Sequence, residues 1–249
     1  MGRIILHGAV IVMLTVLTQL CGIAWALSLT VRRWRVPVFL GAFLVLWVAA
    51  QALAPLAGRV ALPCTGDTLR MQSPLYCATL RNFVTPELAS VAEEAALRVA
   101  DAYPGTVTLA LDGGFPFLDG MPLLPHLSHD DGEKLDFAFF YTDPAGTYLP
   151  GVTRSPVGYW AFETDGASDC PPVRLTMRWG MGWLQPLFPD RPFDPGRTAA
   201  LTEALLDDPR VAKVFLEPPL ATRLGLDSDK LRFQGCRAAR HDDHIHVQL

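Results

Sequence analysis

Apolar residues dominate the start of the chain, where two long runs, residues 4–30 and 36–57, contain no formally charged side chain. A helix needs about 20 consecutive apolar residues to cross a hydrocarbon layer about 30 Å thick. Each run is long enough, so we expect two transmembrane helices within residues 1–58. The alternative is that both runs pack into a soluble core, which two uncharged runs of this length in succession disfavour.

Arginines set the expected orientation of these helices. Arg32, Arg33 and Arg35 lie together in the short connection between the two runs. Short arginine-rich connections stay in the cytoplasm, so both termini would lie outside. The chain would then be anchored through two helices in the lipid bilayer of a bacterial inner membrane, with everything after Gly58 in the periplasm or at the cell exterior.

A cleaved signal peptide is the rival interpretation of the first run. Ala24-Trp25-Ala26 offers the small residues of a cleavage site, and cleavage there would leave the rest of the chain in the opposite orientation. The apolar run continues past this point to Val31, which favours a retained helix.

The pattern changes after the apolar runs. Residues 59–84 are expected to form a juxtamembrane linker, and residues 85–249 a domain. Thr85 and Pro86 are typical of the cap and first position of a helix. The predicted elements are helices at 86–103, 198–208 and 218–226 and strands at 106–112, 134–143, 211–217 and 244–249, with irregular excursions over 143–197. Helices and strands mix without strict alternation, which indicates an α+β fold.

Charge and cysteines narrow the class of protein. The formal net charge of −4 gives no basic footprint for nucleic acid, so no nucleic-acid partner is expected. Four of the five cysteines follow the apolar runs, and an even number in an exported domain suggests two disulfides. Cys64 with Cys77 is the local option and would leave Cys170 with Cys236; two other pairings, and four free thiols in a cytosolic domain, stay open.

Histidines crowd into the last ten residues, RHDDHIHVQL, which hold His241, His244 and His246. Residues two apart on a strand point to the same face, so His244 and His246 would project together while Ile245 and Val247 face the core. Two imidazoles on one face favour a metal site, but a catalytic zinc takes three protein ligands and leaves a position for water.

Further ligands are expected in the stretch PHLSHDDGEKLDF. His129 lies in a loop, Gly132 allows a tight turn, and Asp136 stands among apolar strand residues, where a carboxylate needs a partner or a metal. His129 and Asp136 could therefore converge on one cation. His126, one turn upstream, is an alternative ligand, although a solvated loop histidine is the preferred interpretation.

These motifs together resemble the penicillin-insensitive murein endopeptidases, which belong to the LAS group of zinc peptidases with D-Ala-D-Ala peptidases and hedgehog-like domains. The resemblance rests on Ser128-His129-x-x-Gly132-x-x-x-Asp136, on His241-x-x-His244-x-His246, and on the strand and short helix upstream of the latter. It covers roughly residues 85–249 and implies a small antiparallel-sheet domain. The two expected transmembrane helices depart from the secreted members of that family.

The resemblance implies the roles of individual residues. His129, Asp136 and His246 match the ligands of one zinc ion. His244 matches a residue that activates water or stabilises the transition state, and His241 matches a further active-site histidine. Asp242 and Asp243 could orient histidine rings, although solvated acids in a turn are the commoner case.

The substrate that the resemblance implies is the peptide part of peptidoglycan, cut at the D-alanyl bond of its cross-links. Trp160, Trp179 and Trp183 could line a cleft, and Arg174 or Arg178 could hold a stem-peptide carboxylate, although packing or surface roles are the simpler interpretation of each. The alternatives are a zinc D,D-carboxypeptidase or dipeptidase, a non-catalytic wall-binding or signalling module of the same fold, and a metal-storage or metal-sensing protein. The carboxylate and the ligand spacing favour an open catalytic site over the last.

Overall fold

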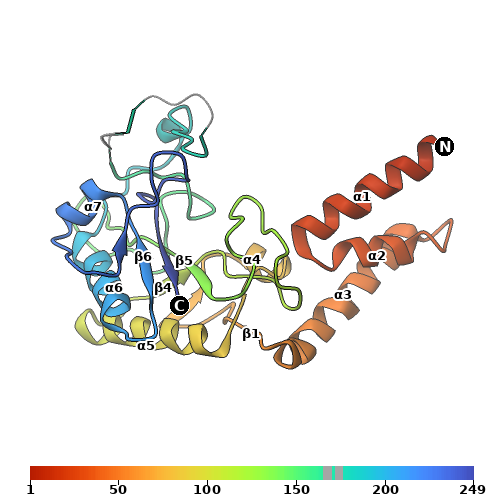
Figure 1. Cartoon of the computed structure of the whole chain (residues 1–249), viewed down its shortest axis with the longest axis horizontal. Helices are drawn as coiled ribbons and strands as arrows, with labels where there is room; N and C mark the ends of the chain where they lie inside the picture. Colours follow the sequence, from red (N-terminus) through yellow and green to blue (C-terminus); the bar gives the residue numbers. More distant parts are fainter. Residues whose placement is uncertain (165–169, 172–175) are drawn as a thin grey trace.

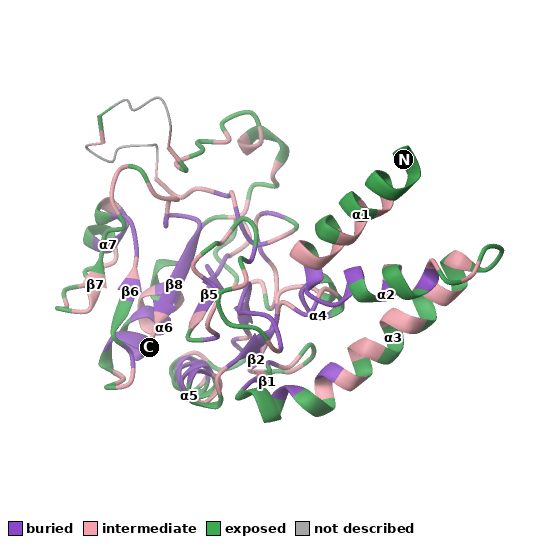
Figure 2. Ribbon diagram, turned by 45° about the vertical axis from the view of Figure 1, so that its right-hand side comes forward, coloured by how far each residue is buried: buried purple, intermediate pink, exposed green. Residues whose placement is uncertain are grey.

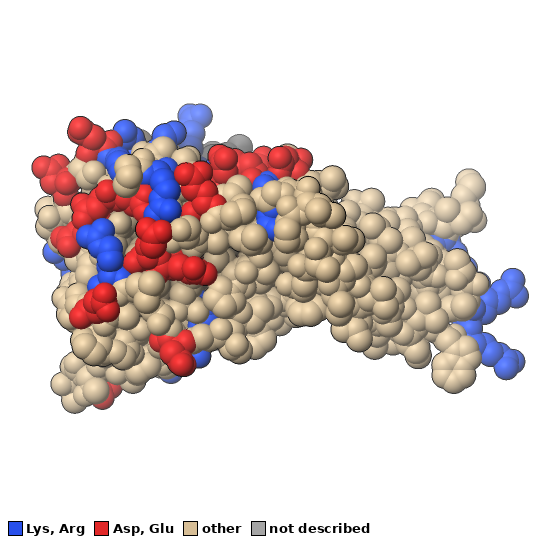
Figure 3. All heavy atoms as spheres, turned by 90° about the horizontal axis from the view of Figure 1, so that it is seen from below, with Lys and Arg blue, Asp and Glu red and all other residues tan. Residues whose placement is uncertain are grey.

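The computed structural model describes residues 1–164, 170–171 and 176–249, which form a helical stalk and a mixed α/β domain (Figure 1). The stalk, residues 2–57, contains α1 (Gly2–Thr18), α2 (Cys21–Ser28), α3 (Arg35–Leu53) and the short helix η1 (Ala54–Ala57). Figure 3 shows that the middle of the stalk carries no charged side chain on the visible face, whereas acidic and basic side chains gather on the domain.

The first apolar run is not one helix. It breaks at Gln19, whose φ of 63° lies in the left-handed region, and restarts where the Cys21 amide donates to Thr18 Oγ1 at 2.9 Å. α1 therefore has 17 residues. Within the described residues, only Arg35–Ala57, with 23 residues, is long and apolar enough to cross a membrane. The second of the two expected transmembrane helices is thus present as a candidate span, and the first is replaced by a helical hairpin.

Packing contacts show that α1 and α2 run antiparallel. The rings of His7 and Trp25 lie 6.0 Å apart. Closer to the turn, a side chain on Gly22 would collide with Thr15, so glycine is needed there for the close approach. The start of the chain consequently lies at the same end of the stalk as the connection between α2 and α3, which carries Arg32, Arg33 and Arg35, and not at the opposite end as expected (Figure 1).

The domain is built on a six-stranded sheet with the strand order β2-β4-β5-β8-β6-β7. The four central strands pair antiparallel, and each edge strand pairs parallel with its neighbour. The strands are β2 (Leu69–Met71), β4 (Thr108–Ala110), β5 (Lys134–Ala138), β6 (Lys213–Phe215), β7 (Leu231–Arg232) and β8 (His244–Gln248); β1 (Val60–Ala61) and β3 (Phe83–Val84) form a separate pair. The expected antiparallel sheet is thus its centre, and the mixed helices and strands are compatible with the α+β class.

One side of the central strands faces the hydrophobic core. Leu135 and Phe137 of β5 are opposite Val247 and Ile245 of β8, and all four are fully buried. They share one core with α5 (Pro86–Ala102) and α6 (Pro195–Asp207). α5 begins as the sequence predicts, with Thr85 accepting from a backbone amide and proline in the first turn. α6 begins in the same way at Asp194, so it starts three residues before the predicted helix at 198–208. Figure 2 shows this burial concentrated in the sheet and the inner face of α5.

Residues 59–84, expected as a linker, are part of the domain. They contain β1, β2, α4 (Pro74–Ala78) and β3, and Met71, Tyr76 and Val84 belong to the main core. The segment was missed because its strands have only two or three residues, too few to give a periodic pattern. The remaining helices are η2 (Gln185–Leu187) and α7 (Pro218–Arg223).

Both disulfides of the local pairing are formed. Cys64 is bonded to Cys77 and Cys170 to Cys236, while Cys21 in the stalk is free. The first bond lies within residues 59–84, and the second joins the excursion to the segment just before His241.

Candidate metal centre

Asp136, His129 and His246 bring three donor atoms together on the side of the sheet that faces away from α5. Asp136 of β5 is directly opposite His246 of β8 in the strand register, and His129 comes from the loop before β5. Asp136 Oδ1 lies 2.6 Å from His246 Nδ1 and 3.3 Å from His129 Nε2, and the two imidazole nitrogens are 3.1 Å apart. All three residues are buried.

This donor set fits a metal ion. Zinc binds imidazole nitrogen and carboxylate oxygen at about 2.0–2.2 Å, so two ligands in a tetrahedral site are roughly 3.3 Å apart. Two of the three distances, 3.3 and 3.1 Å, lie close to that value, and the third, 2.6 Å between Asp136 and His246, is that of a hydrogen bond. These side chains are the one group of metal-ligand type found in the described part of the chain. Two neutral imidazoles and one carboxylate would leave a divalent ion with a net charge of +1.

The loop of residues 113–132, called here the metal-bearing loop, orients His129. His129 Nδ1 donates to the carbonyl of Gly113 at 2.8 Å, which leaves Nε2 with its lone pair toward the triad. Gly132 closes the loop with a φ of 75°, and a side chain there would collide with the Arg59 guanidinium. The tight turn that the sequence predicts at Gly132 is therefore present.

The second carboxylate oxygen of Asp136, Oδ2, accepts a hydrogen bond that fixes the orientation of the side chain. The Tyr159 hydroxyl donates to Asp136 Oδ2 at 2.7 Å and also accepts from the Asp112 amide at 3.1 Å. Tyr159 comes from the excursion that sequence reasoning left unassigned, and nothing in its sequence context marks it as a partner of the metal ligands.

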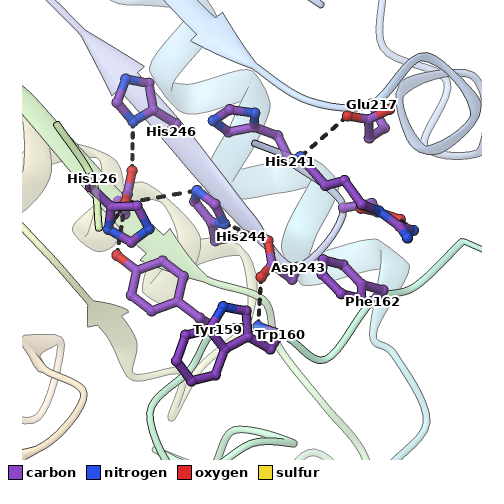
Figure 4. Close-up of polar contacts among 12 residues, drawn as sticks. His126, Tyr159, Trp160, Phe162, Glu217, His241, Asp243, His244 and His246 are labelled. Atoms are coloured by element: carbon purple, nitrogen blue, oxygen red, sulfur yellow. Dashed lines mark hydrogen bonds and ion pairs between the residues drawn. The ribbon is translucent and has the colours of Figure 1, made fainter. Parts of the chain in front are cut away.

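His244 and His246 lie on one face of β8, as the period of two predicts (Figure 4). His244 Nε2 is 3.7 Å from Asp136 Oδ2, beyond hydrogen-bonding distance. Its Nδ1 is 2.5 Å from Asp243 Oδ1, and Asp243 Oδ2 accepts from the Trp160 amide at 2.6 Å. Asp243 is thus buried and orients His244, which was the less favoured interpretation of this acid.

Asp242 pairs with Arg240, whereas the ring of His241 lies beside the rings of the other two C-terminal histidines. Asp242 is not solvated either: Arg240 donates to it, at 2.5 Å from Nη2 to Oδ2, away from the histidine rings. The ring of His241 lies 4.9 Å from that of His244 and 5.5 Å from that of His246. Its Nδ1 is buried without a hydrogen-bond partner among the described residues, so a polar group that enters the site could satisfy it.

His126 is a site residue that sequence reasoning undervalued. Instead of being solvated, it points at Tyr159, with 4.4 Å between ring centroids, and its Nδ1 contacts Asp112 Oδ2 at 2.8 Å (Figure 4). Asp112 also accepts two bonds from Arg81, at 2.6 and 2.8 Å. The available signal was the position of Asp112 at the end of an apolar stretch predicted to form a strand.

The charges of Asp136 and the histidines around it influence one another. Burial raises the pKa of Asp136, but the surrounding imidazoles lower it well below its usual value. Burial lowers the pKa of His246 to about 4 despite Asp136, which keeps its ring neutral. For His129, the effect of Asp136 exceeds that of burial, and the pKa is raised. The Asp136 carboxylate therefore favours positive charge at this position, as it would favour a bound cation.

Cavities surround the triad. One of about 230 Å³ is lined by the three candidate ligands together with His241 and His244. A neighbouring cavity of about 220 Å³ is lined by Arg81, Asp112 and Trp160. A third contains Trp160, Trp179 and Arg240, and His126 lines all three. The triad therefore lines a cavity that has His126 in common with two neighbouring cavities.

Only some of the residues expected to bind substrate lie beside the triad. Trp160 and Trp179 line the cleft, whereas Trp183 is 71% exposed and does not line these cavities. Arg178 forms a two-point ion pair with Glu217, at 3.0 and 2.9 Å, and does not line them either. Arg174 lies outside the described residues.

Comparison with known proteins assigns no family. A scan of the chain against models of known protein families finds no match, and a search of curated proteins finds no match either. The function must therefore be argued from the geometry of the site.

Proposed function

We propose that the chain is a membrane-anchored zinc metallopeptidase that hydrolyses D-alanyl peptide bonds in peptidoglycan cross-links. The observation that carries the proposal is the convergence of His129, Asp136 and His246 in one cavity, with a third histidine, His244, oriented beside them. A storage or purely structural site would be closed by a fourth protein ligand, whereas a catalytic zinc keeps a position open.

The donor chemistry supports zinc. Two imidazoles with one carboxylate suit this ion, and when bound it lowers the pKa of its water to about 7 and polarises a carbonyl. The chain's own contribution is proton transfer. Because Asp243 holds Nδ1 of His244, the Nε2 atom faces the triad and can take a proton from water and deliver it to the leaving amine.

Export supports the choice of substrate. Disulfides persist outside the cytoplasm, and both lie in the domain that follows the candidate span. The resemblance of the histidine and aspartate motifs to those of murein endopeptidases supports the D-alanyl bond of the cross-links as the bond that is cut. Peptidoglycan stem peptides lie in the same compartment, so the enzyme and its substrate would meet there.

The hairpin suggests a topology with the N-terminus in the cytoplasm. The amino terminus, Arg3 and the arginines of the α2–α3 connection then all lie on the same inner side, which satisfies the preference for positive charge there. Phosphatase fusions after Gly58 should be active in the periplasm. A fusion at Met1 should be active only with a cytoplasmic reporter, and periplasmic activity at Met1 would restore the two-span arrangement.

The deciding experiment is incubation of the full-length protein, in detergent micelles, with purified cross-linked muropeptides. Mass analysis should show dimers converted to monomers, with activity lost on chelation and regained with zinc. Release of free D-alanine instead would identify a carboxypeptidase. A zinc-loaded protein that leaves every muropeptide intact would contradict the proposal.

A further inference from the structure

Exposed leucines border the cavities beside the triad. Leu118, Leu124 and Leu127 of the metal-bearing loop are 63%, 46% and 53% exposed. Leu75 of α4, 63% exposed, lines the same cavity as Leu124, and Leu127 lines the cavity over the triad. Single exposed leucines are ordinary, but three on one loop, two of them beside the cavities near the triad, indicate a surface that meets an apolar partner.

The same loop is attached to the tip of the helical hairpin. Gln19, buried at the turn between α1 and α2, accepts from the Phe117 amide at 3.1 Å, and its amide nitrogen lies 3.5 Å from Met121 Sδ. Phe117 also packs against the small apolar cluster that contains Leu20 and, from α3, Ala50. In Figures 1 and 2 this loop lies beside the hairpin turn, at the domain end of the stalk.

A second contact joins the loop to the chain directly after the candidate span, where the first charged residue occurs. Arg59 is the first charged residue after the span Arg35–Ala57, and its buried guanidinium pairs with Asp119, next to Leu118. Gln19 interrupts the other apolar run. Gln19 ends α1, and Arg59 follows the span, so both polar contacts of the loop lie at the domain end of the apolar helices, where the proposed anchor would meet the membrane interface.

We propose that Leu118, Leu124 and Leu127 insert into the outer interface of the bilayer, so that the metal cavity opens at the membrane surface. The inference rests on the proposed membrane anchoring. The bilayer is the occupant because the loop that carries these leucines contacts the domain end of the apolar stalk. The substrate class that this position favours is a stem peptide carried on a membrane-bound lipid.

Nitroxide accessibility tests the insertion without requiring any activity. The full-length Cys21→Ala protein is placed in bilayers of phosphatidylethanolamine and phosphatidylglycerol and labelled at Leu118→Cys or Leu127→Cys. Val45→Cys on α3, 68% exposed, is the lipid reference. Leu97→Cys, 53% exposed like Leu127 and toward the end of α5 away from the stalk, is the water reference.

The expected result is collision with dissolved oxygen well above that at Leu97, and collision with a water-soluble nickel complex well below it. Values equal to those at Leu97 would overturn the insertion while leaving the anchor intact. Low collision with both reagents would mean that a second protein copy covers the loop, which also overturns it. A water-exposed Val45 would instead show that the anchoring itself is wrong.

Leu118→Asp tests the substrate class, since Leu118 lines none of the described cavities named above. Cleavage of a lipid-linked stem peptide in bilayers should fall about fivefold, corresponding to ~1 kcal/mol for a charge near the interface. Cleavage of a water-soluble muropeptide should stay unchanged. An equal loss on both substrates would contradict a membrane-held substrate, and so would no loss on either.

Discussion

Asp136 on β5 and His246 on β8 are a cross-strand pair in which Oδ1 and Nδ1 lie 2.6 Å apart, although 110 residues separate them in the chain. The flanking pairs, Leu135 with Val247 and Phe137 with Ile245, point into the core. Because a shift of one residue would exchange the two faces, the same core packing that fixes the register also fixes the metal site.

Removing a ligand should remove the metal. In Asp136→Ala or His246→Ala, two protein ligands remain, so zinc affinity should fall by more than the ~10–100-fold typical of an outer partner. His241→Ala is the matched control, because its ring is buried in the same cluster without belonging to the triad. Competition with a chelator of known affinity measures the change. Stoichiometric zinc in His246→Ala would remove this residue from the ligand set.

His244→Ala should separate binding from chemistry. The three ligands stay in place, so zinc should be retained, whereas loss of the oriented imidazole should lower hydrolysis by about 10²–10⁴-fold. Bound zinc and muropeptide cleavage are measured on the same sample. If the variant loses its zinc as completely as His246→Ala, then His244 is a ligand. If it keeps full activity, His241 and His126 become the candidates for proton transfer.

Tyr159→Phe should weaken the metal site through Asp136. The hydroxyl donates to the carboxylate oxygen that faces away from the triad, and loss of such an outer partner typically costs about 10–100-fold in metal affinity. Tyr76→Phe is the control, since its hydroxyl donates to the Val157 carbonyl at 2.6 Å, away from Asp136. Equal zinc affinity in the Tyr159 and Tyr76 variants would show that this hydrogen bond does not support the metal.

Asp112 should make the fold sensitive to acid. Burial raises its pKa, but His126 and Arg81 lower it to about 2, from 3.8. Because the pKa of Asp112 is lower in the folded than in the unfolded state, its ionised form stabilises the fold at any pH above the unfolded-state pKa. This contribution, of order 2 kcal/mol, is lost as the pH falls from about 4 to about 2.

The variant Asp112→Asn checks this directly. Thermal unfolding should show a lower midpoint at neutral pH, because Arg81 stays buried without its charged partner, a loss typically of about 3–5 kcal/mol. The midpoint should then change less than in the parent protein between about pH 4 and pH 2. An identical acid profile in both proteins would show that other carboxylates dominate the transition.

Local sequence alone determined several structural features of this protein. The period of two in HIHVQ places His244 and His246 on one face, and Thr85 and Pro86 start α5, because strand geometry and helix capping depend only on neighbours in the chain. The apolar composition of residues 36–57 likewise determines a helix long enough to span a membrane.

Tertiary structure decided the rest. The pairing of β5 with β8, the network of Arg81, Asp112 and His126, and the support from Tyr159 join segments whose spacing in the chain carries no signal. The break at Gln19 was also hidden, because glutamine does not interrupt an apolar helix by propensity. Its hydrogen bond to the Phe117 amide, 98 residues away, accompanies the turn, and only packing of the hairpin against the domain brings these two groups together.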